Sequence, residues 1–132
     1  MSEPSSVDEF ARRLVETVRD LAIDSCDQLV GGVGRGVLGA RWREQLGAPS
    51  AREAVSELIP DVVDQVLFHL LDAIDNGLLP LAWKRDGTFE DLADAGQGEM
   101  AGWLMAGKGG WIDQYSARRH FDPFEGLDEN GG

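Results

Sequence analysis

Residues 60 to 77, PDVVDQVLFHLLDAIDNG, restrict the fold more than any other part of the chain. At 100° per residue, their aliphatic side chains spread over one broad side of a helix, a pattern typical of a helix largely surrounded by protein. The residues on that side are Val62, Val63, Val66, Leu67, Leu70 and Ile74. The pattern predicts the core helix of a helical domain.

The first of two capping boxes places the start of a helix near the N-terminus. Ser6 is followed three residues later by Glu9, and apolar residues then recur at helical spacing, which predicts a first helix over 6–30. Five glycines follow within residues 31–39, GGVGRGVLG, and glycine often ends a helix because it tolerates the left-handed conformation. We therefore expect a Gly-rich connection over residues 31–49.

The second capping box opens the central helix. Ser50 and Glu53 follow Pro49, and the helical pattern continues from there to an Asn-Gly pair, which predicts a helix over 50–76. Pro60 lies within this range and either kinks the helix or begins a new segment.

Shorter elements are expected over residues 78–121. Two apolar pieces flank an Asp-Gly pair, a dipeptide favoured in tight turns, and predict a small β-hairpin near residues 79–91. GEMAGWLMAG (98–107) and GWIDQYSARRHF (110–121) predict two short helices. The basic residues that end the second helix, Arg118, Arg119 and His120, either complement its dipole or pair with the acidic stripe of the central helix.

The whole chain fits a mainly α, single compact helical domain with one small hairpin. Its 132 residues are enough for one core, and no boundary divides them into two. The final stretch, GLDENGG, carries almost no apolar residue, so we expect a flexible tail over 122–132.

Cysteine and histidine are scarce. Cys26 is the single cysteine, which excludes an internal disulfide, and with His69 and His120 it provides too few ligands for a structural zinc site. The N-terminus lacks a basic segment followed by an apolar run, and no stretch has the length of a membrane span. We expect a cytoplasmic protein without a cofactor.

Acidic residues dominate the charge. Twenty-four Asp and Glu against twelve Lys and Arg leave a net charge of −12. Phosphate backbones and anionic lipid surfaces are repelled by such a protein, so we expect neither direct nucleic-acid binding nor membrane binding. A basic protein partner is attracted instead, and the alternative is that the acidity serves solubility alone.

The glycine run could be a phosphate cradle or a mobile joint. A dinucleotide-binding fold places such a run after a buried strand, and a P-loop ends in Gly-Lys-Ser/Thr. Here a helix precedes the run and VLGARW follows it, which favours a joint between helices. The basic side chains Arg35, Arg41 and Arg43 lie in or next to this run.

Carboxylates gather on one arc of the central helix. On the helical wheel they surround an aromatic side chain, an arrangement suited to a basic partner whose charges pair around the ring. The predicted partner-binding residues are Asp61, Asp64, Phe68, Asp72 and Asp75. The alternative is that Phe68 packs under the C-terminal helices and the acids form a solvated face.

Catalytic and metal chemistry is less well supported by the pattern. Asp61, Asp64 and Asp72 could hold a divalent cation, but no EF-hand loop is present. Cys26 and His69 could form a nucleophile and base, but a lone cysteine in an apolar helical pattern is typical of a small buried residue, and His69 is expected in the core. We therefore predict a protein that is not an enzyme and holds no metal.

A rival hypothesis is a small enzyme or ligand-binding protein. Its pocket would lie between the C-terminal tryptophans, Trp103 and Trp111, and the Gly-rich loop. An enclosed pocket with convergent polar groups would favour this reading, whereas a flat acidic surface favours inhibition of a partner.

Three segments in order, VDQVLFHLLDAIDNGLLPLAW, GEMAGWLMAG and GWIDQYSARRHF, resemble small acidic bacterial proteins encoded beside polymorphic toxins, among them immunity proteins. The resemblance covers about half of the chain and lies in size, acidity and segment order. It implies stoichiometric inhibition, in which an acidic surface covers the basic substrate groove of a nuclease or another cationic effector. An acidic inhibitor encoded by a phage and directed against a nucleic-acid-binding defence complex would have the same features. The sequence is also compatible with a homo-oligomer.

Overall fold

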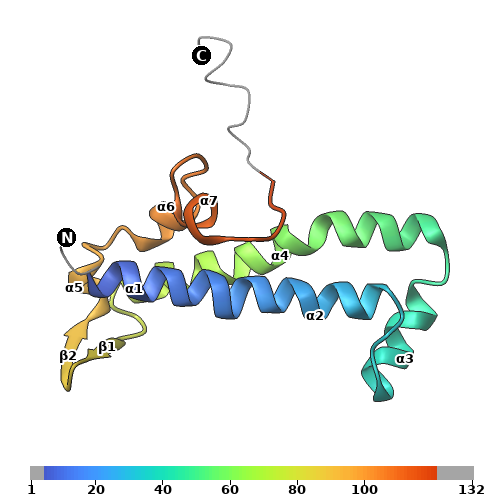
Figure 1. Cartoon of the computed structure of the whole chain (residues 1–132), viewed down its shortest axis with the longest axis horizontal. Helices are drawn as coiled ribbons and strands as arrows, with labels where there is room; N and C mark the ends of the chain where they lie inside the picture. The colour runs from blue at the N-terminus through green and yellow to red at the C-terminus, as the bar shows by residue number, and fades with distance from the viewer. Residues whose placement is uncertain (1–4, 122–132) are drawn as a thin grey trace, which may run out of the picture.

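The computed structural model describes residues 5–121, which form a layer of two long helical rods with shorter elements packed against it (Figure 1). The first rod consists of α1 (Ser6–Arg13), the π-helical turn η1 (Leu14–Arg19) and α2 (Asp20–Val30). The second rod is α4 (Pro49–Asp75). The protein is mainly α with one small antiparallel hairpin, which confirms the predicted fold class.

The first rod begins where a polar residue caps it. The hydroxyl of Ser5, and not that of the predicted Ser6, accepts a hydrogen bond from the Asp8 amide at 3.1 Å. At the end of η1 the backbone makes a wider turn, in which the amide of Asp20 donates to a carbonyl five residues earlier. Arg19 and Asp20, at the end of this turn, are both buried.

The predicted connection over 31–49 contains a helix, α3 (Gly36–Gln45). The prediction missed it because two glycines and a short length hide its helical pattern. Gly34 and Gly39 approach closely, since a Cβ on Gly39 would lie 2.1 Å from the Gly34 carbonyl oxygen. Arg43 Nη1 donates to that oxygen at 2.6 Å. The turn thus presents carbonyl oxygens to an arginine, whereas a phosphate cradle requires amide groups.

The second rod continues without a break through Pro60. Pro49 occupies the first turn of α4, where its missing amide costs nothing, and Pro60 is buried within the helix. The N-cap is Ala48, which has no capping side chain, so the predicted box of Ser50 and Glu53 does not form the cap. Of the two alternatives that Pro60 left open, a new segment is wrong.

The hairpin lies within the range that the sequence predicts. Strands β1 (Ala82–Arg85) and β2 (Thr88–Asp91) pair antiparallel, with Arg85 opposite Thr88. Asp86 and Gly87 form the turn with φ of 50° and 79°. Positive φ at both turn residues matches the right-handed twist of the strands, which is why Asp-Gly is favoured there.

Three short helices follow the hairpin. They are α5 (Leu92–Ala95), α6 (Met100–Leu104) and α7 (Trp111–Tyr115), the last two lying inside the longer ranges predicted for them. The Asp91 carboxylate caps α5 by accepting from the Asp94 amide at 3.1 Å.

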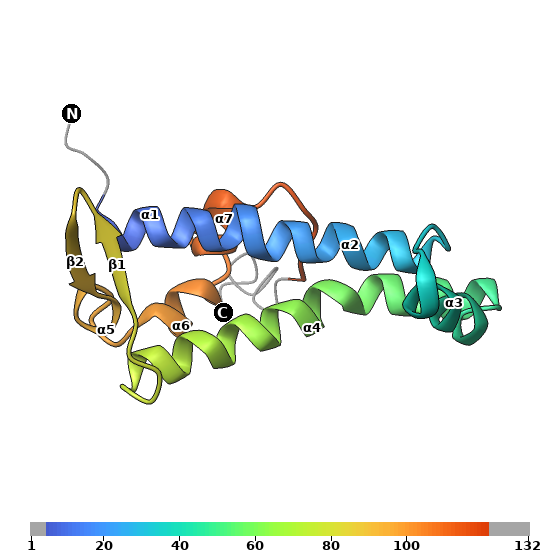
Figure 2. The same cartoon turned by 90° about the horizontal axis from the view of Figure 1, so that it is seen from below.

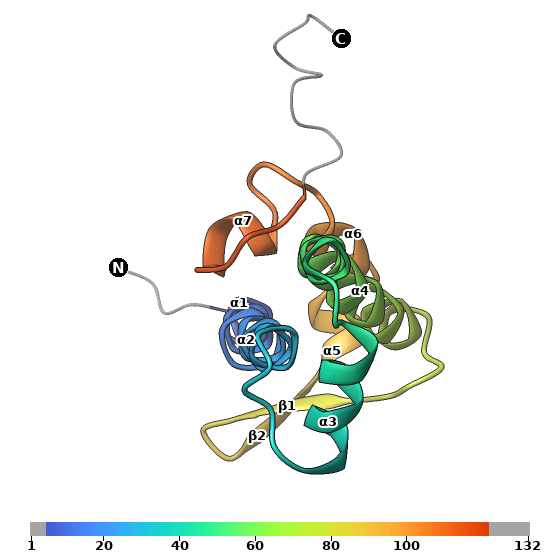
Figure 3. The same ribbon diagram turned by 90° about the vertical axis from the view of Figure 1, so that its right-hand side faces the viewer.

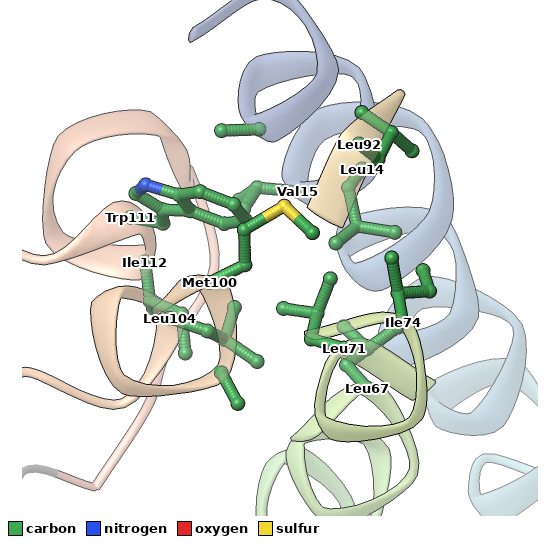
Figure 4. Close-up of a cluster of buried hydrophobic side chains, with 12 residues drawn as sticks. Leu14, Val15, Leu67, Leu71, Ile74, Leu92, Met100, Leu104, Trp111 and Ile112 are labelled. Atoms are coloured by element: carbon green, nitrogen blue, oxygen red, sulfur yellow. The ribbon is translucent and has the colours of Figure 1, made fainter. Parts of the chain in front are cut away.

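The main core lies where these short helices pack on the N-terminal half of the first rod and the C-terminal half of α4 (Figure 4). The rings of Trp103 and Trp111 are 6.2 Å apart, and Phe10 meets Trp111 edge-on at 6.3 Å. The buried side chains are Ala11, Leu14, Val15, Leu67, Leu71, Ile74, Leu92, Met100, Ala101, Leu104, Trp111 and Ile112. The tryptophan pair therefore serves packing.

The two sides of the rod layer differ. α7 and residues 116–121 lie against one side, and the hairpin and α3 project from the other, near opposite ends (Figures 1 and 3). The predicted flexible tail over 122–132 lies outside the described residues. Among the described helices, none has both the length and the apolar character that a membrane crossing requires.

Candidate functional site

The carboxylates of the predicted stripe do not share one environment. Asp64 is buried at 6% exposure, and its two oxygens accept hydrogen bonds from Arg19 Nε at 2.6 Å and Nη2 at 3.2 Å. The prediction of an exposed acid is therefore wrong at this position. Nothing in the helical wheel of α4 reveals a partner 45 residues away, on the other rod.

Arg19 is completely buried and every donor of its guanidinium is used. Nη1 donates to Asp20 at 3.2 Å and to the Ser116 hydroxyl at 2.8 Å, and the second Nη2 bond goes to the Arg119 carbonyl at 3.2 Å. With the two bonds to Asp64, all five N–H groups have an acceptor. The charge can stay buried because it is paired and fully hydrogen-bonded.

Asp20 extends this network to the last described segment. Its Oδ1 accepts from the Ser116 hydroxyl at 2.7 Å, and its Oδ2 accepts from the Ala117 amide at 2.9 Å. Arg19, Asp20 and Asp64 thus fasten residues 116–119 onto both rods. We call these three side chains the buried ion network.

Asp75 also serves the fold. Its Oδ1 accepts from the Met100 amide at 3.2 Å and its Oδ2 from the Ala101 amide at 2.9 Å. These amides belong to the first turn of α6, which otherwise lacks a capping side chain. Asp75, predicted to face a partner, instead holds a C-terminal helix against α4.

Arg118 and Arg119 pair with α2 and not with the stripe. Arg118 makes a two-point contact with Asp24, at 2.5 and 2.9 Å, and Arg119 makes one with Asp27, at 2.9 and 2.8 Å. The hydrogen bond from Arg118, with its charge, lowers the pKa of Asp24 below its ordinary value. Pairing with the acidic stripe, one of the two uses that the sequence left open for these arginines, is therefore not observed, since their partners within the chain are Asp24 and Asp27.

Three of the remaining acids of α4 lie on one arc of the helix around Phe68. We call this surface the acidic edge: Glu57, Asp61, Phe68 and Asp72. Their spacing places them within about 60° of one another around the helix. Glu57 and Asp72 are exposed and Asp61 is half-buried. Within residues 5–121, neither Glu57 nor Asp61 has an ion-pair partner within 4 Å.

The aromatic residue of the edge is less available than predicted. Phe68 is half-buried and packs against the main core, while its outer neighbour His69, predicted to lie in the core, is exposed. Leu58, next to Glu57 in the chain, is 57% exposed and had no predicted role. Leu58 and the rim of Phe68 therefore supply the apolar contact area beside these carboxylates.

The central helix also exposes valines that periodicity assigned to the core. Val62 is 63% exposed and Val66 is 65% exposed. The predicted core side of α4 was too broad, because the other rod and the short helices cover only part of it. Val63, Leu67, Leu70 and Ile74 do pack in or against the core, as predicted.

The catalytic alternatives gain no support from the side chains. Burial and the charge of Asp27 raise the pKa of the Cys26 thiol, which is the reverse of the change that activates a cysteine nucleophile. No hydrogen bond joins Cys26 to His69 in the described part of the chain. Among residues 5–121, no group of three or more His, Cys, Asp or Glu is placed to hold a metal ion.

The rival pocket would need segments that lie apart. The tryptophans belong to α6 and α7, near the hairpin end of the rods, whereas the glycine run leads into α3 at the other end (Figure 1). Fold and surfaces together define a small, mainly α protein in which some acids bind groups of the same chain and others, among them Asp61, have no ion pair with the described residues. Comparisons with protein-family models, with curated protein sequences and with solved structures find no match to this chain.

Proposed function

We propose that this protein binds a basic protein partner in the cytoplasm and neutralises it, as an immunity protein or a similar inhibitor does. One observation carries the proposal: within residues 5–121, Glu57, Asp61 and Asp72 have no ion-pair partner within 4 Å. Asp20, Asp24, Asp27, Asp64 and Asp75 all bind groups of the same chain. On the acidic edge, Asp61 accepts no hydrogen bond from the described residues, Asp72 accepts one from Asn76 Nδ2 at 3.1 Å, and Glu57 lines a hollow together with Arg119.

Negative charge of this kind mainly raises the rate at which the protein and a basic partner associate. A net charge of −12 attracts a cationic partner over distances of about 10 Å at moderate salt, and the edge gives the encounter a preferred orientation. Apolar contacts then slow dissociation, because they are formed only in the docked complex. Leu58, at 57% exposure, provides such a contact without a role in the core.

Scaffold rigidity supports the same function. α4 is held from one side by the buried ion network and from its C-terminal end by the contact between Asp75 and α6. A side chain on such a helix presents its charge at a fixed position, so less conformational entropy is lost when a partner binds.

The test uses the purified chain, immobilised, with lysate of the source cells loaded at low salt and eluted at high salt. The double variant Asp61→Lys with Asp72→Lys should lose the basic protein that the wild type retains. The matched control, Asp94→Lys with Glu99→Lys, changes the net charge equally at two exposed positions outside α4 and should retain it.

The retained protein is then identified and its association rate measured against the same variants. We expect charge reversal on the acidic edge to slow association about tenfold and to flatten its salt dependence, and Leu58→Ala to accelerate dissociation. Equal loss in both charge variants would mean that overall charge, and not this edge, governs binding. Retention of no basic protein at all would overturn the proposed function.

A further inference from the structure

The side of the rod layer opposite α7 is framed by two projections. The hairpin descends from one end of the layer and α3 from the other, with the two rods exposed between them (Figures 1 and 2). The end-on view places both projections on the side away from α7 (Figure 3). We call the surface between them the open face.

Helical spacing shows which residues of α4 lie on the open face. Val55 lines a hollow of about 240 Å³ together with Trp42 and Leu46, at and just after the end of α3, so it points toward that projection. Val62 and Val66 follow Val55 by 7 and 11 residues, which returns them to within about 20° of it. Both are more than 60% exposed.

The first rod contributes an apolar residue to the same face. Val18 is 48% exposed and lines a hollow with Trp83 of β1, so it points toward the hairpin. Val18, Val62 and Val66 therefore give the open face an apolar centre. Isolated exposed aliphatic residues are normal, but a group framed by projections marks an interaction surface.

The two ends of the open face carry opposite charge. The hairpin has three exposed acids, Asp86, Glu90 and Asp91, against two bases, Lys84 and Arg85. Phe89 is 67% exposed, and the Lys84 ammonium lies 5.8 Å from its ring centre. The α3 end has three exposed bases, Arg35, Arg41 and Arg43, against one exposed acid, Glu44. Val37, at 89% exposure, and Leu38, at 56%, lie in the same helix. Each end therefore combines apolar side chains with a net charge opposite in sign to that of the other end.

We propose that the open face binds a second copy of this chain in an antiparallel, two-fold symmetric dimer. In such a dimer the same patch meets itself, so the hairpin of one subunit lies against α3 of its partner. The two-fold axis passes near Val62, the middle residue of α4, and brings the apolar centres together. An apolar centre with charged ends is the usual anatomy of a protein interface.

The area that a stable dimer needs is a small part of the surface of this protein. A stable interface buries about 800 Å² per subunit, roughly one tenth of a small protein's surface. The surface here is 8723 Å², and the open face extends along most of the layer between the hairpin and α3 (Figure 2). The acidic edge lies about a third of a turn away around α4, so a dimer would leave it facing solvent.

Sedimentation equilibrium of the full chain, from about 1 to 200 µM, tests the proposal. We expect a particle of twice the 14.4 kDa monomer mass at the upper concentrations. Val62→Glu and Val66→Glu place two carboxylates near the two-fold axis and should each raise the dissociation constant at least about 100-fold. Ala106→Glu, an equal charge change in the turn before α7, should leave it unchanged. Circular dichroism of each variant checks that these surface changes keep the helical fold.

Charge exchange tests the arrangement of the ends. Arg41→Glu and Glu90→Arg should each weaken the dimer, and the double variant should return to within about threefold of the wild type, because the pair is restored across the interface. The proposal is wrong if the wild type stays monomeric at all of these concentrations. It is also wrong if Val62→Glu leaves the dissociation constant of the dimer unchanged. If the single variants weaken the dimer and the double variant does not restore its affinity, the antiparallel arrangement is wrong. These variants leave the acidic edge intact. The dimer proposal and the proposed partner-binding function can therefore be refuted independently of each other.

Discussion

Arg19 and Asp64 form a buried two-point ion pair between the two rods, with Nε to Oδ1 at 2.6 Å and Nη2 to Oδ2 at 3.2 Å. The pair lies where α2, α4 and residues 116–119 meet, because Ser116 and Arg119 supply two further acceptors for the same guanidinium. Asp64, which the helical pattern assigned to a partner-binding surface, therefore stabilises the fold instead.

Asp64→Ala should be strongly destabilising, because it leaves the buried charge of Arg19 without its main partner. Breaking such a pair from one side costs about 3–5 kcal/mol in the free energy of unfolding. Urea unfolding followed by circular dichroism measures this loss. Asp61→Ala, three residues away and without an ion pair in the described chain, should change stability by less than about 0.5 kcal/mol. Equal effects of the two variants would contradict a structural role for the pair.

Asp75→Ala should loosen α6 while leaving α4 intact. The carboxylate satisfies two amides in the first turn of α6, and loss of a helix cap costs about 1 kcal/mol. Hydrogen exchange should show faster exchange of the Met100 and Ala101 amides in particular. Unchanged protection of these two amides would show that the contact does not hold the helix.

The contact between Asp24 and Arg118 should make stability depend on pH in the acid range. The pKa of Asp24 is lowered in the folded protein from the ordinary value of 3.8, so the ionised form stabilises the fold. This contribution is complete above the unfolded pKa and disappears as the pH falls through the lower folded pKa. NMR titration of the Asp24 carboxyl carbon should show the lowered pKa, and Arg118→Gln should move it back toward 3.8. If the pKa of Asp24 is the same in Arg118→Gln and in the wild type, Arg118 is not the cause of its lowered value.

Gly39→Ala should destabilise the packing of α3. The new Cβ would lie 2.1 Å from the Gly34 carbonyl oxygen, and relief of such an overlap typically costs about 1–3 kcal/mol. Gly102, inside α6, is a matched control because a Cβ there meets nothing within 4 Å. Gly102→Ala should stabilise by about 0.5–1 kcal/mol, since alanine loses less backbone entropy on folding. Thermal melts of the two variants should therefore shift in opposite directions.

Local signals in the sequence determined most of the secondary structure. Apolar spacing located both rods, and the Asp-Gly pair located the hairpin turn at Asp86 and Gly87, because these features act between residues a few positions apart. α3 escaped prediction since the glycines that let Gly34 approach Gly39 also weaken its helical pattern.

Only the tertiary structure decided which surfaces of α4 are available. Asp61 and Asp64 lie on the same arc of the helical wheel, about 60° apart. Asp64 is nevertheless buried against an arginine of the other rod, whereas Asp61 is only half-buried. Val62 and Leu67 belong to one apolar pattern, yet Val62 is 63% exposed and Leu67 only 4%. Periodicity states the direction in which a side chain leaves its own helix. What lies in that direction depends on segments distant in the chain, and their positions are set by packing of the whole molecule.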